Sequence, residues 1–189
     1  KSIYGLINNA ANNDPKLKQN EQYEDKLEKF ELERWQRDIS ISLTGSFLCS
    51  KYFGQEIIRN KKGGTIINIS SDLGLIAPNQ NLYEKKFKNK ILKNKKPISY
   101  SVSKSGIIGL TRYISTYWSD KNLRCNCICP GGIFNNQSRE FHKKIKELIP
   151  LKRMANKNDY SSTLIWMLSE KTEYLNGAII SVDGGRTAW

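Results

Sequence analysis

Metal-binding side chains are scarce in this chain. It has four cysteines and a single histidine, His142. Cys125, Cys127 and Cys129 alternate along a predicted strand, so their side chains share one face. They could hold a metal, but buried thiols that pack as small apolar groups are the simpler interpretation. His142 lies in a lysine-rich helical stretch and offers little help as a fourth ligand. We therefore expect no metal site.

Long apolar runs are also missing. No stretch approaches the length of a membrane-spanning helix, and residues 1–7 are too short for a signal peptide and are predicted to form a buried strand. The cysteine pattern does not suggest disulfides, which fits a reducing compartment. We therefore expect a cytoplasmic location and no membrane partner.

Acidic residues are few compared with basic ones. The chain has 31 Lys and Arg against 18 Asp and Glu, which gives a net charge of +13 and favours an anionic partner. No nucleic-acid-binding motif accompanies this charge, so we expect a small anionic molecule and no nucleic acid. Much of the excess lies in one segment with Glu84 as its only acid, and this segment is a solvated loop or a binding loop. Its lysines are Lys85, Lys86, Lys88, Lys90, Lys93, Lys95 and Lys96.

Strand and helix patterns alternate along the chain. Apolar, β-branched runs predict strands at residues 4–7, 65–71, 123–129 and 178–182, and helical spacing predicts helices at 31–60, 100–120, 137–148 and 159–169. This alternation indicates a mostly parallel sheet that binds ligands at the carboxyl ends of its strands. Residues 12–28 and 72–99 are predicted loops, and the lysine-rich loop covers about 77–98. Gly45 interrupts the first long helix and is predicted to allow close packing against a neighbour.

A tyrosine and a lysine are spaced for acid–base chemistry. Tyr100 and Lys104 stand four residues apart, and on a helix they share one face. A lysine ammonium near a phenol lowers the tyrosine pKa, so such a tyrosine can give or take a proton near neutral pH. The spacing alone is not specific, since Tyr117 and Lys121 repeat it. Neighbouring motifs decide whether the pair has a function.

Six segments resemble motifs of the short-chain dehydrogenase/reductase family. Each match is weak alone, but their order and the predicted elements that carry them make the set specific, and it spans Leu6 to the C-terminus. The segments are Asn8-Asn9-Ala10-Ala11, Trp35 through Leu43-Thr44-Gly45, Ile67-Asn68-Ile69-Ser70-Ser71, Tyr100-x-x-x-Lys104, Asn126-Cys127-Ile128-Cys129-Pro130-Gly131-Gly132-Ile133, and Gly177 to the end of Asp183-Gly184-Gly185.

The resemblance implies an α/β fold, a Rossmann-like doubly wound parallel sheet, in a single domain over residues 1–189. Family members begin with a strand, a Gly-x-x-x-Gly-x-Gly turn and a helix whose N-terminus cradles the cofactor pyrophosphate. That turn is absent here, and the sequence begins at what would be the fourth strand. We therefore expect the C-terminal part of a longer protein, without the first three strands of the family fold and without the residue that selects NAD or NADP.

Roles for individual residues also follow from the resemblance. Tyr100 is implied as the general acid–base, Lys104 as the group that lowers its pKa and binds the nicotinamide ribose, and Ser71 as the group that holds the substrate oxygen. Ser42 stands where most members have an asparagine that helps to hold a proton-relay water, so the relay survives through an extra water or is weakened. The cofactor, NAD or NADP, is expected beside Tyr100, Lys104, Asn9, Ala10, Pro130, Gly131, Gly132 and Ile133.

A narrower resemblance concerns the substrate. The segment Ser71-Asp72-Leu73-Gly74-Leu75-Ile76-Ala77-Pro78 and the insert after it resemble members found with bacterial flagellin-modification and surface-sugar pathways. With the lysine-rich segment, this implies hydride transfer to or from a carbonyl or alcohol of a phosphorylated or nucleotide-linked sugar. The helices around Phe47 and Ile107 resemble those that pair between subunits, which implies a homodimer or homotetramer.

Plainer interpretations stay open for the same residues. A non-catalytic binding protein or an inactive fragment would keep the fold without turnover, as Ser42 and the absent nucleotide half allow. Ser71 can simply cap a loop, Ser42 can be an ordinary helix-face serine, and residues 130–132 can be a strand-ending turn.

Overall fold

Four parallel strands form the central sheet of the computed structural model, which describes residues 2–12, 25–87, 90–93 and 95–189. The strands are β1 (Gly5–Asn8), β2 (Gly64–Ile69), β5 (Leu123–Pro130) and β6 (Ile179–Val182). They lie in the order β1-β2-β5-β6, and every pairing is parallel. This arrangement confirms the predicted α/β parallel sheet and brings the carboxyl ends of all four strands to one edge.

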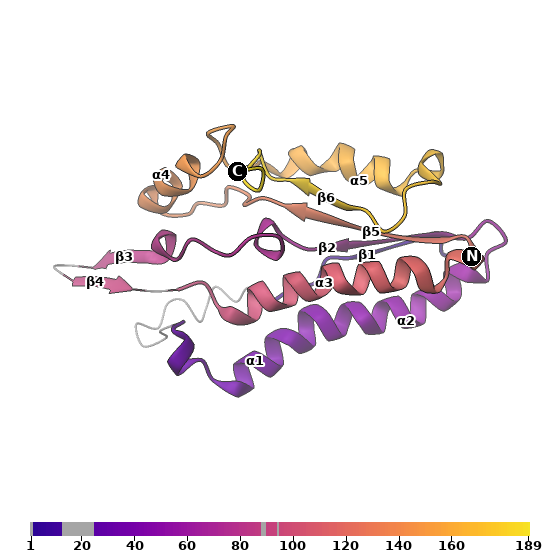
Figure 1. The fold of residues 1–189 in the computed structure, drawn as a ribbon, viewed down its shortest axis with the longest axis horizontal. Coiled ribbons are helices and arrows are strands. Elements are labelled where there is room, and N and C mark those ends of the chain that lie inside the picture. Colours follow the sequence, from indigo (N-terminus) through magenta and orange to yellow (C-terminus); the bar gives the residue numbers. More distant parts are fainter. Residues whose placement is uncertain (1, 13–24, 88–89, 94) are drawn as a thin grey trace.

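Helices cover both faces of the sheet (Figure 1). On one face lie α2 (Gly45–Ile58) and α3 (Ile98–Tyr117), and on the other lies α5 (Ser161–Leu168). A fourth helix, α4 (Arg139–Glu147), lies toward the carboxyl edge of the sheet. The three layers of a doubly wound fold are therefore present in the described part of the chain.

Strand β2 explains why both faces must be covered. Its side chains alternate, so Ile66 packs with Ile57 and Ile114 on the α2/α3 side, while Ile67 packs with Met167 on the α5 side. All of these side chains are buried. A strand that is apolar on both faces is typical of a parallel sheet between two helical layers.

A π-helical turn divides the first long helix. The predicted helix over residues 31–60 consists of α1 (Leu32–Ile39), a π turn at Ser40–Thr44, and α2. The prediction that Gly45 permits close packing is wrong, because a Cβ there would meet nothing nearer than the Ser40 carbonyl oxygen at 3.5 Å. The close approach occurs at Gly106 of α3, where a Cβ would lie 2.8 Å from Leu43 Cδ2.

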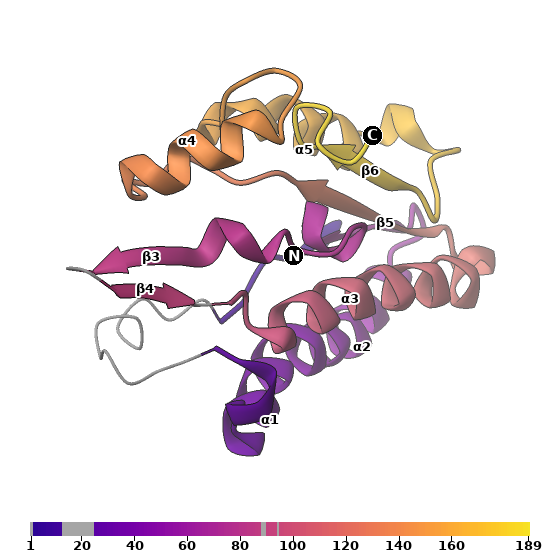
Figure 2. The same cartoon turned by 60° about the vertical axis from the view of Figure 1, so that its left-hand side comes forward.

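The lysine-rich segment, predicted as a loop over about 77–98, contains a β-hairpin. Strands β3 (Glu84–Phe87) and β4 (Lys90–Lys93) pair in antiparallel fashion and project beyond the carboxyl edge of the main sheet (Figure 2). Before the hairpin, Leu82 is buried against Ile145 and Ile149. This part is therefore anchored by apolar packing rather than solvated. The side chains of residues 85–94, which include most of the lysine cluster, lie outside the described residues.

The remaining elements agree with the sequence patterns to within a few residues, as the bounds of α3, α4, α5, β5 and β6 show. Of the predicted loop over residues 12–28, residues 13–24 lie outside the described part, and residues 27–29 form a short 3-10 turn. None of the described helices has the length and apolarity needed to cross a membrane.

Candidate active site

The carboxyl edge of the sheet brings Ser71, Tyr100 and Lys104 together. Ser71 comes two residues after the end of β2, and Tyr100 and Lys104 lie on successive turns of α3. The Lys104 ammonium donates a hydrogen bond of 2.8 Å to the carbonyl oxygen of Ile69, the last residue of β2. Its nitrogen lies 5.8 Å from the centre of the Tyr100 ring. The predicted common face for Tyr100 and Lys104 is confirmed.

Close backbone packing fixes α3 against the end of β2. The Ser70 hydroxyl donates a hydrogen bond of 2.7 Å to the Lys104 carbonyl oxygen. A Cβ on Gly74 would lie 2.9 Å from that same oxygen, so only glycine lets the chain after Ser71 pass so near α3. The helix that carries Tyr100 and the turn that carries Ser71 are therefore packed directly against each other.

The protonation behaviour of Tyr100 differs from the sequence-based prediction. Burial raises the pKa of the Tyr100 phenol, the interaction with the Ser71 side chain lowers it, and the Asp72 carboxylate raises it. The net shift is upward, so the expected lowering by Lys104 is not seen. Lys104 is itself buried, which lowers the pKa of its ammonium, and it is directed at the Ile69 carbonyl.

The Ser71 hydroxyl is held by its own turn. It donates a hydrogen bond of 2.7 Å to Asp72 Oδ1 and accepts one of 3.2 Å from the Leu73 backbone N–H. Ser71 is thus the N-cap of the 3-10 turn Asp72–Gly74. Because a hydroxyl has a single proton, Ser71 can donate to a substrate oxygen only by turning away from Asp72.

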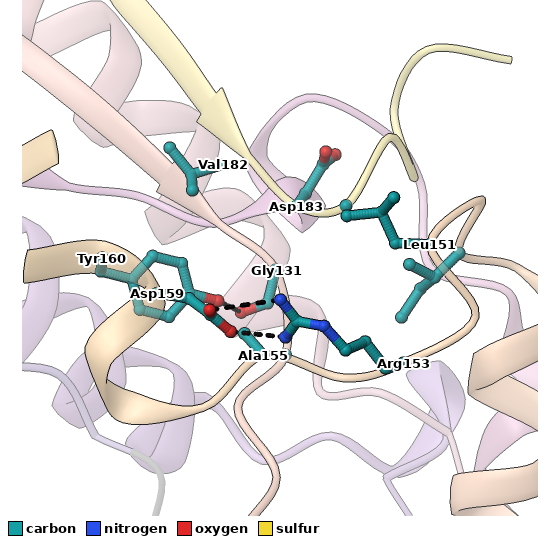
Figure 3. A pocket seen from close by; sticks show the side chains of 11 residues that line it. Gly131, Leu151, Arg153, Ala155, Asp159, Tyr160, Val182 and Asp183 are labelled. Atoms are coloured by element: carbon teal, nitrogen blue, oxygen red, sulfur yellow. Dashed lines mark hydrogen bonds and ion pairs between the residues drawn. The ribbon is translucent and has the colours of Figure 1, made fainter. Parts of the chain in front are cut away.

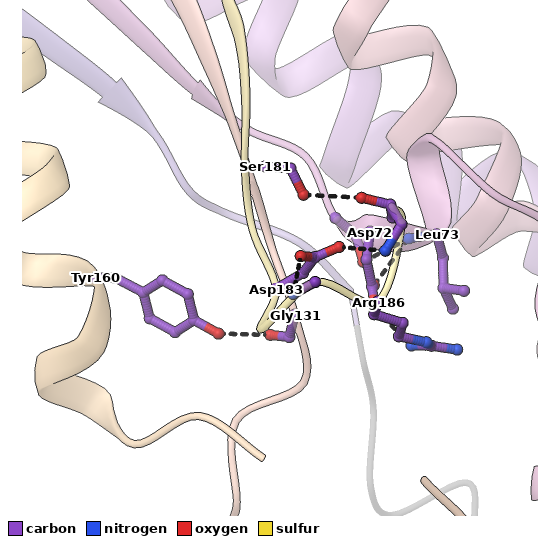
Figure 4. A network of polar contacts seen from close by, with 10 residues as sticks. Asp72, Leu73, Gly131, Tyr160, Ser181, Asp183 and Arg186 are labelled. Carbon is purple, nitrogen blue, oxygen red and sulfur yellow. Dashed lines mark hydrogen bonds and ion pairs between the residues drawn. The ribbon is translucent and has the colours of Figure 1, made fainter. Parts of the chain in front are cut away.

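Asp72 forms a buried ion pair with Arg186 from the C-terminal segment (Figure 4). The Arg186 Nη1 atom donates to Asp72 Oδ2, while Asp72 Oδ1 accepts from the Leu73 backbone N–H at 2.8 Å. Asp183 shapes the turn that carries Arg186, because its carboxylate accepts from the Gly185 and Thr187 backbone N–H groups at 2.9 and 2.8 Å. The last residues of the chain therefore reach the predicted active site.

Ser42 lies at the π turn and contacts the segment after β1 rather than Lys104. Its hydroxyl accepts a hydrogen bond of 3.4 Å from the Asn12 backbone N–H. The Ser42 carbonyl oxygen accepts one of 2.7 Å from the Ser46 hydroxyl. The buried carboxylate of Asp38, one turn earlier, accepts from Asn12 Nδ2 at 2.5 Å and from the Ser99 hydroxyl at 2.6 Å. These contacts link the start of α3 to the loop after β1.

The residues expected beside the cofactor follow β1 and β5. Asn9 and Ala10 are exposed where β1 ends, while Pro130 is the last residue of β5 and residues 131–133 begin the turn after it. Tyr160 fixes this turn by donating a hydrogen bond of 2.7 Å to the Gly131 carbonyl oxygen. A cavity of about 190 Å³ lies here and is lined by Gly131 and Gly132, with the Arg153–Asp159 ion pair at its side (Figure 3). Tyr100, Lys104 and Ser71 do not line it.

The cysteines behave as the apolar interpretation predicts. Cys125, Cys127 and Cys129 are fully buried on β5, and all four cysteines are free thiols. Burial raises the pKa of Cys125 to about 12. In the part of the chain that the structure describes, no three metal-binding side chains gather.

Several residues near the site were not assigned to it individually from the sequence, although Lys96 was placed in the lysine-rich segment. Lys96 lies over the Tyr100 ring, with its ammonium 3.7 Å from the ring centre, and the same ammonium lies 5.9 Å from the centre of the Tyr83 ring. Asp72 carried a usable signal, since a carboxylate directly after the serine in an apolar stretch needs a partner when it is buried. Arg186 carried none, because its partner is 114 residues away.

Comparisons with known proteins identify the family of this chain. The family model described as short chain dehydrogenase matches residues 1–84, and the one described as enoyl-(acyl carrier protein) reductase matches residues 87–187. Glucose 1-dehydrogenase 2 of Bacillus subtilis is 31% identical over 84% of this chain and 57% of its own length. 2-Dehydro-3-deoxy-D-gluconate 5-dehydrogenase of Dickeya dadantii is 28% identical over 86% of this chain and 60% of its own length.

Solved structures show the same fold. A short chain dehydrogenase from Leptospira borgpetersenii with bound NAD+ superposes with a TM-score of 0.76 and 32% identity, over 85% of this chain and 59% of that one. The chain therefore spans less than two thirds of the length of these relatives. With a matched model over more than half of its residues, this chain belongs to the short-chain dehydrogenase/reductase family.

Proposed function

We propose that this chain carries the acid–base half of an NAD(P)-dependent oxidoreductase that moves a hydride to or from a carbonyl or alcohol of an anionic sugar. The observation that carries the proposal is the meeting of Ser71, Tyr100 and Lys104 at the carboxyl edge of a parallel sheet. Named dehydrogenases among the relatives support the reaction class.

The residues present suit the nicotinamide end of the cofactor. The Lys104 ammonium already donates to one carbonyl and has two further N–H groups for ribose hydroxyls. Tyr160 donates a hydrogen bond to the Gly131 carbonyl oxygen within residues 130–133, and two glycines there would let a ring approach the backbone. The Gly-rich turn that would hold the pyrophosphate is not in this sequence. The bound nicotinamide would supply or accept the hydride.

The protein groups would manage the proton and the substrate oxygen. Tyr100, whose raised pKa keeps it protonated at neutral pH, donates a proton to the carbonyl oxygen during reduction. Ser71 turns from Asp72 to hold that oxygen. Lys104, whose nitrogen lies 5.8 Å from the centre of the Tyr100 ring, would hold the ribose of the cofactor beside Tyr100. Ser42 takes part in a proton relay only through a water between it and Lys104, since its own contact is with Asn12.

Charge supports an anionic substrate. Lys96 lies on the Tyr100 ring, and the hairpin beside it belongs to the lysine-rich segment. The Dickeya relative is named for a sugar acid and the Bacillus relative for a neutral sugar, so both sugar types belong in a screen. We propose a phosphorylated, nucleotide-linked or carboxylated sugar, in keeping with the resemblance to surface-sugar pathways. The free cysteines fit a reducing cytoplasm.

Self-association through α2 and α3 is part of the proposal. These helices expose aromatic side chains that a monomer would leave in water, namely Phe47, Tyr52, Phe53, Tyr113 and Tyr117. A homodimer or homotetramer would cover them.

The experiment uses the protein purified at its natural length from its source organism. NADH and NADPH binding is measured by fluorescence, and turnover is followed at 340 nm with sugar phosphates, nucleotide sugars, sugar acids and glucose. We expect cofactor binding and turnover with at least one anionic class, with kcat/KM about tenfold or more above that for glucose. Cofactor binding without turnover on any class would support the non-catalytic binding protein instead. Salt-sensitive binding to arbitrary DNA without cofactor binding would support a nucleic-acid binder.

A further inference from the structure

The Asp72–Arg186 ion pair is buried on both sides. Asp72 and Arg186 are 3% and 6% exposed, so both charges have lost most of their water. The attraction within a buried pair roughly balances that loss, and an apolar pair of similar size would hold the fold as well. Arg186 Nη2 is also buried with no hydrogen-bond partner among the described residues. The pair therefore calls for a role other than stabilising the fold.

Asp72 contacts Ser71 as well as Arg186. One carboxylate oxygen accepts from the Ser71 hydroxyl at 2.7 Å, and the other accepts from Arg186. A lone carboxylate would be a strong acceptor and would hold the single Ser71 proton. A carboxylate neutralised by a guanidinium is a weaker acceptor, so less free energy is needed to turn the hydroxyl toward another oxygen.

We propose that Arg186 is a positioning residue for Ser71, acting through Asp72, and that it frees the Ser71 hydroxyl to turn from the carboxylate to the oxygen of the substrate. This inference rests on the proposed function and assigns part of the site to the C-terminal segment. The Asp72 charge raises the Tyr100 pKa even in the paired state, and loss of the Arg186 charge should raise it further. The other ionisable groups that face Tyr100 are Tyr83 before the hairpin, Lys96 before α3 and Lys104 on α3.

The test compares Arg186→Met, Arg186→Lys and the double variant Asp72→Asn/Arg186→Met. In Arg186→Met the unpaired carboxylate should hold Ser71 and raise the Tyr100 pKa, so kcat should fall about tenfold with little change in KM. The Lys variant keeps the charge and should recover most of the activity. The double variant removes the strong acceptor and should be more active than Arg186→Met. Arg59→Met, which breaks an exposed ion pair with Glu56, is the matched control.

Tyrosine titration gives a readout that needs no turnover. Absorbance at 295 nm is followed against pH in each background with and without Tyr100→Phe, and the difference reports Tyr100 alone. We expect the Tyr100 midpoint to rise in Arg186→Met and to return in the double variant. The inference would be overturned if the Tyr100 midpoint were the same in the wild type and all variants, or if the double variant were less active than Arg186→Met. If Arg186→Met does not fold, the neutral double variant must match the wild-type midpoint and keep its activity. A wild-type protein with no turnover would defeat the proposed function, while the titration still decides the inference.

Discussion

The ammonium nitrogen of Lys96 lies 3.7 Å from the centre of the Tyr100 ring, so a cation sits directly on the proposed acid–base residue. If the substrate is anionic, Lys96→Met should raise its KM about 5- to 30-fold, which corresponds to about 1–2 kcal/mol for one desolvated charge contact. The cofactor Kd should not change. Steady-state kinetics with the best anionic substrate checks this.

Lys121→Met is the control for that change, because it removes the same charge from an exposed side chain paired with Asp120 near the amino ends of the strands. An equal rise of KM in both variants would mean that only the net charge of the protein affects substrate binding. An unchanged KM in Lys96→Met would show that Lys96 does not bind the substrate.

The raised pKa of Tyr83 should make the folded protein less stable at high pH. The pKa of Tyr83 is raised from 10.0 to about 12, mainly because the side chain is buried, and the Arg186 charge opposes this shift. The folded state therefore keeps this proton when the unfolded state has lost it, so the contribution is complete below pH 10 and is lost as the pH rises toward 12. Urea unfolding from pH 9 to 11.5 should show the free energy of unfolding falling, less steeply in Tyr83→Phe. Tyr113→Phe, at an exposed site, should follow the wild type.

Tyr160 should support the cofactor turn. Tyr160→Phe removes the hydrogen bond of 2.7 Å to the Gly131 carbonyl oxygen and keeps the ring. We expect a loss of about 1 kcal/mol in stability and a several-fold weaker cofactor Kd, because the turn is less well held. Calorimetry and fluorescence titration measure the two effects. Tyr174→Phe, at a fully exposed tyrosine, should change neither. An unchanged cofactor Kd in Tyr160→Phe would show that this turn does not contribute to cofactor binding.

The aromatic surface of α2 and α3 should set the oligomeric state. Tyr113 is 64% exposed and stacks on Tyr117 at a ring distance of 5.6 Å. Tyr113→Glu would place a charge within the proposed interface and should reduce the mass measured by light scattering to that of the monomer. Tyr174→Glu should leave the mass unchanged. A wild-type protein that is already monomeric would contradict the proposed assembly.

Features of the fold that depend on local sequence patterns could be predicted from the sequence. Apolar, β-branched runs predicted the four strands, and helical spacing placed Tyr100 and Lys104 on one face of α3. The family motifs brought Ser71 to the same site. Burial of the three β5 cysteines also followed from their spacing.

Long-range contacts could not be predicted in the same way. The Asp72–Arg186 pair and the Asp38–Ser99 hydrogen bond join residues 114 and 61 positions apart, and no local pattern encodes them. The rise in the pKa of Tyr100 also depends on its burial in the fold, whereas the spacing to Lys104 suggested a fall. The hairpin was missed because its lysines indicate a solvated loop, although Leu82 and Tyr83 before it anchor the segment on α4.

The proton transfer assigned to Tyr100 is the centre of this account, and Tyr100→Phe tests it most directly. In the protein of natural length, single-turnover oxidation of NADH or NADPH is followed with the best sugar substrate, and cofactor binding is measured separately. We predict that the hydride-transfer rate falls by about 10²- to 10⁴-fold while the cofactor Kd stays within about twofold of the wild type. A rate close to that of the wild type would show that another group moves the proton and would contradict the assignment of this site.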